Sequence, residues 1–145
     1  MDWTCSQPRL AWYYRLVLGL IGSGLMLLLG TAFWLSPNSE GTGTHRQLGL
    51  PPCTIVALYE TRCPACGMTT SWAHLTRGNL IGSFRANSAG LTLGLLAIVV
   101  GPWLFSTALW GRWTVGPPDD SMIIGVTIFI VVVMLADWIV RLTWM

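Results

Sequence analysis

The fold is decided by long apolar runs, the clearest of which is residues 122–140, MIIGVTIFIVVVMLADWIV. A helix needs about 20 apolar residues to cross the hydrocarbon core of a bilayer. Two more runs of this kind come earlier in the chain, at residues 16–35 and 89–109. Because backbone polar groups in lipid must be satisfied within their own segment, we expect all three runs to be transmembrane helices.

Composition supports a membrane location for the whole chain. Of its 145 residues, 53% are hydrophobic and only 10% are charged, and nine are tryptophan, a residue enriched at the headgroup level. The net charge of +2 is small and dispersed, whereas a nucleic-acid surface needs clustered cations. We therefore predict one all-α integral membrane domain over residues 1–145, with the lipid bilayer as its partner and no nucleic acid.

Two questions of membrane placement arise from the first run. Residues 30–32, Gly-Thr-Ala, have the small side chains that a signal peptidase prefers, but the apolar run continues through Phe33 and Trp34, which favours a retained span. The positive-inside rule leaves the orientation open, since the arginines nearly balance. Arg9, Arg15 and Arg112 fall on one side, and Arg46, Arg77, Arg85 and Arg141 on the other.

The connections between the spans differ greatly in length. Residues 111–121 form a short polar turn, so the second and third spans should be antiparallel neighbours. Residues 36–88 are long enough for structure of their own. Within them Met68, Trp72 and Leu75 recur at helical spacing, which predicts a short amphipathic helix at the membrane interface that ends near Gly78.

The long connection also contains Cys53, Cys63 and Cys66, whereas Cys5 precedes the first span and should lie across the membrane. In one interpretation the three are ligands of a tetrahedral, zinc-like metal ion. His74 would lie too far along its helix to be the fourth ligand, while His45 or Glu60 could reach.

Two other interpretations of the cysteines remain. Cys63-Pro-Ala-Cys66 resembles the active turn of thioredoxin-like oxidoreductases, in which a dithiol and a disulfide interconvert, although no βαβ pattern surrounds it here. The interpretation we favour is structural: Cys53 forms a disulfide with Cys63 or Cys66, or the thiols pack as small apolar groups.

Other polar residues have simpler roles. Thr69, Thr70 and Ser71 would satisfy the first amides of the short helix. Asn87 would cap the second span or bond to the cysteine loop, with capping preferred. Asp137 and Arg141, four residues apart, would form an ion pair near the headgroups.

Residues 51–90, PPCTIVALYETRCPACGMTTSWAHLTRGNLIGSFRANSAG, resemble the bacterial domain-of-unknown-function family 2752, whose members are small integral membrane proteins. Thr70 stands where the family usually has arginine, and Ser88 where it usually has proline. The resemblance implies an inner-membrane location but no activity. The matching positions are Cys53, Cys63, Pro64, Cys66, Gly67, Thr69, Gly78, Asn79, Leu80 and Asn87.

These observations predict a multi-pass membrane protein with a cysteine loop and interfacial helix over residues 51–88. We expect a non-enzymatic accessory or scaffold subunit that presents this loop to another membrane protein. We expect no cofactor, with zinc as the candidate if one is bound. The alternative is a membrane thiol–disulfide or metal-handling protein that uses Cys63 and Cys66 with Cys53.

Overall fold

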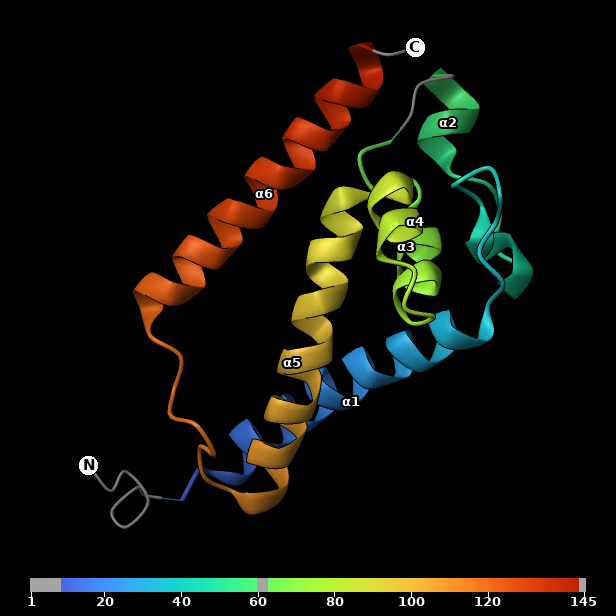
Figure 1. Cartoon of the computed structure of the whole chain (residues 1–145). Coiled ribbons are helices and arrows are strands. Elements are labelled where there is room, and N and C mark those ends of the chain that lie inside the picture. Colours follow the sequence, from blue (N-terminus) through green and yellow to red (C-terminus); the bar gives the residue numbers. More distant parts are fainter. Residues whose placement is uncertain (1–8, 60–62, 144–145) are drawn as a thin grey trace.

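The computed structural model describes residues 9–59 and 63–143, and within these ranges the protein is helical without strands. The described residues form three long helices and several short ones. Figure 1 shows the short helices grouped beside the first two long helices. The long helices are α1 (Trp12–Trp34), α5 (Ser88–Trp110) and α6 (Asp120–Thr143). The short elements are η1 (Thr44–Leu48), α2 (Thr54–Tyr59), α3 (Met68–Leu75) and α4 (Leu80–Ala86).

The three long helices confirm the all-α membrane fold. They contain 23, 23 and 24 residues and are long and apolar enough to cross a membrane. The apolar runs expected at 16–35, 89–109 and 122–140 fall on these helices, apart from one residue at the end of the first. The protein is therefore a multi-pass membrane protein in contact with the lipid bilayer.

Helices α1 and α5 pack antiparallel and cross closely at glycines. A Cβ placed on Gly22 would lie 2.7 Å from the backbone nitrogen of Phe105 and 2.9 Å from the carbonyl oxygen of Gly101. Nearer the end of α5, the Arg15 Nε donates a hydrogen bond to the Ala108 carbonyl at 2.9 Å. Small residues therefore bring the two backbones together, as is common between transmembrane helices.

Helices α3 and α4 form a hairpin that packs on the first half of α5 (Figure 1). A Cβ on Gly90 would touch the Ser71 side chain, and the Trp72 Nε1 donates to the Gly90 carbonyl at 2.8 Å. The helix expected to end near Gly78 is present as α3 and stops at Leu75, but its buried side matches the expected apolar face only in part. Met68 and Trp72 are half-buried, while the buried positions are Thr70, Ser71, Ala73 and Leu75.

Helix α6 is attached mainly at one end. None of its residues is buried, and Asp137, near its end, bonds to a side chain at the start of α5. There the Ser88 Oγ donates to the Asp137 carboxylate at 2.8 Å. The Arg141 Nε lies 2.8 Å from the same carboxylate, which confirms the expected ion pair. α6 is thus the antiparallel neighbour of α5, joined where α5 begins.

Candidate functional site

Three cysteine sulfurs meet in the loop before α3. The Sγ atoms of Cys53, Cys63 and Cys66 all lie within 4.8 Å of one another, and the three side chains are free thiols of intermediate exposure. In a tetrahedral zinc–thiolate site the Zn–S length of 2.3 Å separates neighbouring sulfurs by about 3.8 Å. Small side-chain rotations would therefore bring all three sulfurs onto one metal ion.

The second and third cysteines lie on a tight turn that depends on Gly67. The Cys66 N–H donates to the Cys63 carbonyl at 2.9 Å. Gly67 follows with φ 88°, a left-handed conformation that favours glycine. A Cβ at this position would also collide with the carbonyl oxygens of Ala86 and Gly41. Gly67 is thus required both by its backbone conformation and by the space around it.

Asn87 fixes this turn to the start of α5. Its side chain is fully buried, and its Nδ2 donates to the carbonyls of Pro64 and Cys66, both at 3.1 Å. Its Oδ1 accepts from the Gly90 N–H at 2.7 Å and so caps α5. The sequence offered capping and a bond to the loop as alternatives, and the side chain does both.

The facing wall of the site comes from residues 38–46. The hydroxyl oxygens of Thr44 and Thr70 lie 2.8 Å apart and both side chains are fully buried, which ties this wall to α3. Thr44 Oγ1 also accepts from the Asn38 N–H at 3.1 Å. Thr70 is therefore part of a buried hydroxyl pair.

Between the two walls lies a cavity of about 350 Å³. The Nε2 of His45 is 3.2 Å from the Pro51 carbonyl, so this ring braces the segment that leads to Cys53. Besides the three cysteines, the polar side chains that line the cavity are Asn38, Glu40, Thr42, His45, Arg46, Thr69 and Thr70.

The environments of two thiols differ. Backbone N–H groups of Val56 and, less strongly, Ile55 lower the pKa of Cys53, which precedes α2. Burial raises the pKa of Cys66 to about 11. The thiolate is the form that attacks electrophiles and binds metals. Cys53 is thus the more readily ionised of these two.

The other residues singled out in the sequence divide between two places. Pro64, Gly67, Thr69 and Asn87 belong to the cysteine loop or its walls. Gly78 and Asn79 instead form the turn between α3 and α4, where the Asn79 Oδ1 accepts from the Gly82 N–H at 2.8 Å.

His74, which the sequence placed too far away to be the fourth ligand, lies at the hairpin turn, with its Nδ1 3.3 Å from the Asn79 Nδ2. His45 lines the cavity, while Glu60, like Cys5, lies outside the described residues. Across the part of the chain that the structure describes, the metal-ligating group consists of the three sulfurs. Thr44 and Asn38 were not expected at the site, because no local pattern marks their partners.

Comparison with known proteins places the site within a family match. No curated protein and no solved structure matches the chain. The family described as "Protein of unknown function (DUF2752)" matches residues 53–101, from the first cysteine of the cluster to the middle of α5. The resemblance seen in the cysteine loop is therefore confirmed over residues 53–101.

Proposed function

We propose that this membrane protein binds a thiophilic metal ion of the zinc class through Cys53, Cys63 and Cys66. The observation that supports this proposal is the convergence of the three sulfurs within 4.8 Å. A disulfide needs only two sulfurs and leaves the third without a role. A metal ion uses all three, because thiolates are the preferred ligands of Zn²⁺ and similar soft cations.

The surroundings suit such a site. The Cys63–Cys66 turn is held by Asn87 and by the left-handed Gly67, so two ligands are oriented before the metal arrives. The cavity beside the sulfurs leaves room for a fourth ligand from outside the cluster. Because the thiols must lose their protons on binding, metal affinity should rise with pH.

The role expected from the sequence is compatible with this chemistry. A metal ion would fix the cysteine loop above the start of α5, where an accessory or scaffold subunit would present it to another membrane protein. The family resemblance supports a bacterial inner-membrane location. In this proposal a metal ion holds the cysteine loop, whereas the sequence favoured a disulfide.

A second candidate is thiol–disulfide exchange, and the lowered pKa of Cys53 favours it. In this chemistry the thiols of Cys63 and Cys66 become a disulfide, and their two electrons and two protons reduce a disulfide in a partner protein. One thiolate of the pair would attack the partner disulfide and release one partner thiol, and the other would attack the mixed disulfide and release the second. Cys53 would then exchange with the Cys63–Cys66 bond, forming a disulfide with one of these cysteines and freeing the other as a thiol.

Metal analysis of the full chain, purified in detergent without chelators, tests the proposal. We expect one zinc per chain, and a Co²⁺-loaded form with strong thiolate-to-cobalt absorption. Cys53→Ser, Cys63→Ser and Cys66→Ser should each weaken binding at least tenfold, whereas Cys5→Ser, the matched control, should not. A metal-free protein that takes up no Co²⁺ would overturn the proposal. A reversible decrease of two hydrogens in the mass of the peptide, as Cys63 and Cys66 form a disulfide, would favour thiol–disulfide exchange.

A further inference from the structure

We propose that α3 and α4 form a re-entrant hairpin, which enters the bilayer beside α5 and presents one face of α4 to lipid acyl chains. This inference concerns the surface around the cysteine site and does not depend on metal binding. It replaces the expectation of a helix that lies flat on the membrane.

The hairpin extends along α5, away from the end at which α5 begins. The Ser71 Oγ donates to the Asn87 carbonyl, at the start of α5, at 3.0 Å. Further along, a Cβ on Gly94 would collide with the Leu75 side chain. The rise from Asn87 to Gly94 is about 10 Å, while α5 as a whole is about 34 Å long. If α5 crosses the 30 Å core, the hairpin turn lies about a third of the way through it. The end of α1 that contacts Arg77 then lies at the same depth, so α1 crosses obliquely to α5 (Figure 1).

The backbone polar groups of the turn are hydrogen-bonded within the protein, as a lipid environment requires. Five consecutive N–H groups, from Thr76 to Leu80, donate to carbonyls within the hairpin. The Gly82 N–H is capped by the Asn79 side chain. The Arg77 guanidinium donates to the Ala73 carbonyl at 2.9 Å and to the Ala32 carbonyl of α1 at 3.5 Å. Water is therefore not needed for these groups.

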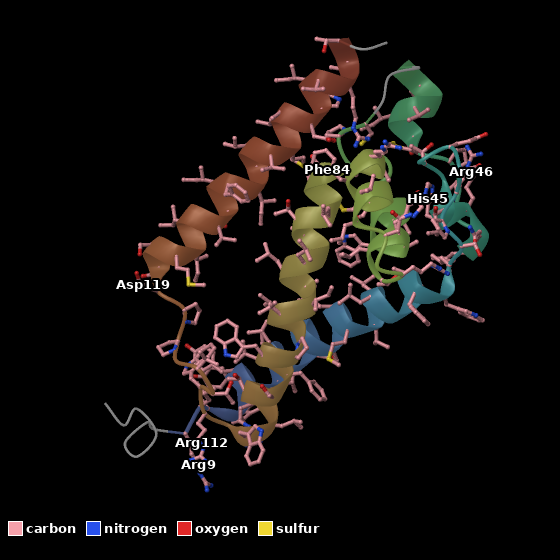
Figure 2. All side chains as sticks on the ribbon, viewed as in Figure 1. Arg9, His45, Arg46, Phe84, Arg112 and Asp119 are labelled. Atoms are coloured by element: carbon pink, nitrogen blue, oxygen red, sulfur yellow. The ribbon has the colours of Figure 1, made fainter. Side chains whose placement is uncertain are left out.

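The outward face of α4 is apolar. Leu80, Ile81 and Phe84 share one side of the helix and are 53%, 68% and 60% exposed. The opposite side buries Ser83, whose hydroxyl oxygen is 2.8 Å from that of Ser71. In water this face would expose three large apolar side chains, whereas in lipid the same side chains would contact apolar acyl chains. In Figure 2 the labelled Phe84 lies at the upper end of the hairpin, on the side toward α6.

The polar side chains at the turn have partners within the protein, although Arg77 and Asn79 are themselves exposed. His74 and Asn79 contact each other through their side chains. The Arg77 guanidinium lies 5.9 Å from the centre of the Phe33 ring, beside the end of α1. Arg85, in the last turn of α4, is placed where a long cation can extend toward the headgroups. The charge distribution therefore permits insertion.

Depth measurement by electron paramagnetic resonance tests this proposal without altering the cysteines. A ketone amino acid that replaces Leu80 or Phe84 is coupled to a nitroxide, and the full chain is reconstituted in phosphatidylcholine vesicles. Collision with oxygen, which partitions into lipid, is compared with collision with a water-soluble nickel chelate. Labels at Val99, exposed in the middle of α5, and at Leu50, exposed in the loop, are the lipid and water controls.

We expect the Leu80 label to be deeper than the Phe84 label, and both to be more accessible to oxygen than the Leu50 label. Equal depths at the two positions would indicate a helix lying on the surface, and nickel accessibility equal to that at Leu50 would indicate exposure to water. Protection from both reagents that varies with the protein-to-lipid ratio would indicate a second copy on this face. Each of these three results would overturn the proposal. Ile81 replaces Leu80 if the labelled chain melts below the unlabelled protein.

Discussion

At the residue scale, Asn87 connects the membrane helix to the cysteine loop. Its one amide group holds two loop carbonyls, and its oxygen caps α5. Because the side chain is fully buried, each lost bond would leave a buried group without a partner. The position of the thiols thus depends on a residue that carries no reactive chemistry.

Asn87→Ala is expected to lower the free energy of unfolding by about 2–4 kcal/mol, from one lost cap and two lost loop bonds. Asn79→Ala is the matched control: it removes a cap from α4 on an exposed side chain and should cost about 1 kcal/mol. Unfolding in detergent, followed by circular dichroism, measures both. Equal losses in the two variants would contradict the role given to Asn87.

The thiols should also react in a fixed order. In chelator-treated protein, iodoacetamide should modify Cys53 before Cys66, because backbone N–H groups lower the pKa of Cys53 while burial raises that of Cys66 to about 11. Both rates should increase with pH as thiolate forms, with Cys53 already reactive at a pH where Cys66 is mostly protonated. Peptide mass spectrometry after timed quenching gives the two rates. In urea the difference should disappear, and faster modification of folded Cys66 would contradict this prediction.

Sequence reasoning found the residues of the site unequally. Cys53, Cys63, Cys66 and Gly67 belong to a short motif, so their chemistry and turn geometry were visible in the sequence. Thr44 and Thr70 are 26 residues apart and pair only after the chain folds. A threonine that bonds across the fold has the same sequence signal as one that faces solvent, so the second wall could not be predicted.

At the scale of elements, the crossing of α1 and α5 limits side-chain size. Gly22→Ala is expected to destabilise the protein by about 1–3 kcal/mol, since the new methyl group meets backbone atoms of α5 that cannot rotate away. Gly24→Ala, in the same helix, is the control: a Cβ there meets nothing within 4 Å. That change should be neutral or stabilising by up to about 1 kcal/mol. Thermal unfolding in one detergent compares the variants, and similar losses would argue against the close crossing.

The long helices could be predicted because a membrane span is recognised in the sequence by its length and hydropathy. Of the short ones, α3 was predicted and α4 was not. α4 has seven residues, too few for a period to stand out, and its sequence LIGSFRA mixes apolar and polar residues evenly. In α3 the expected apolar face matches the buried side only in part: Leu75 packs against Gly94 as an apolar face would, but small Ser71 packs against Gly90. Close packing at Gly90 selected a small side chain there.

For the whole molecule, the two ends of the bundle differ in chemistry. One end contains the cysteine cluster, the start of α5 and the Ser88–Asp137–Arg141 joint to α6. The other contains the loop between α5 and α6, with Asp119 before α6 and Asp120 as its first residue. Figure 1 shows α5 connecting these two ends. Arginines occur near both ends, so charge alone leaves the orientation in the membrane open. The structure nevertheless separates the two ends by the length of α5.

That separation predicts a labelling result in intact cells. Val115 is 84% exposed in the loop after α5, and a cysteine introduced there, in a chain that carries Cys5→Ser, should lie across the membrane from Cys53. A membrane-impermeant maleimide should therefore modify position 115 or the native cluster, but not both, until the cells are permeabilised. The chain without the Val115 change is the control for labelling of the cluster. Modification of both from outside would mean that α5 does not cross the membrane, because one crossing must separate the two sites.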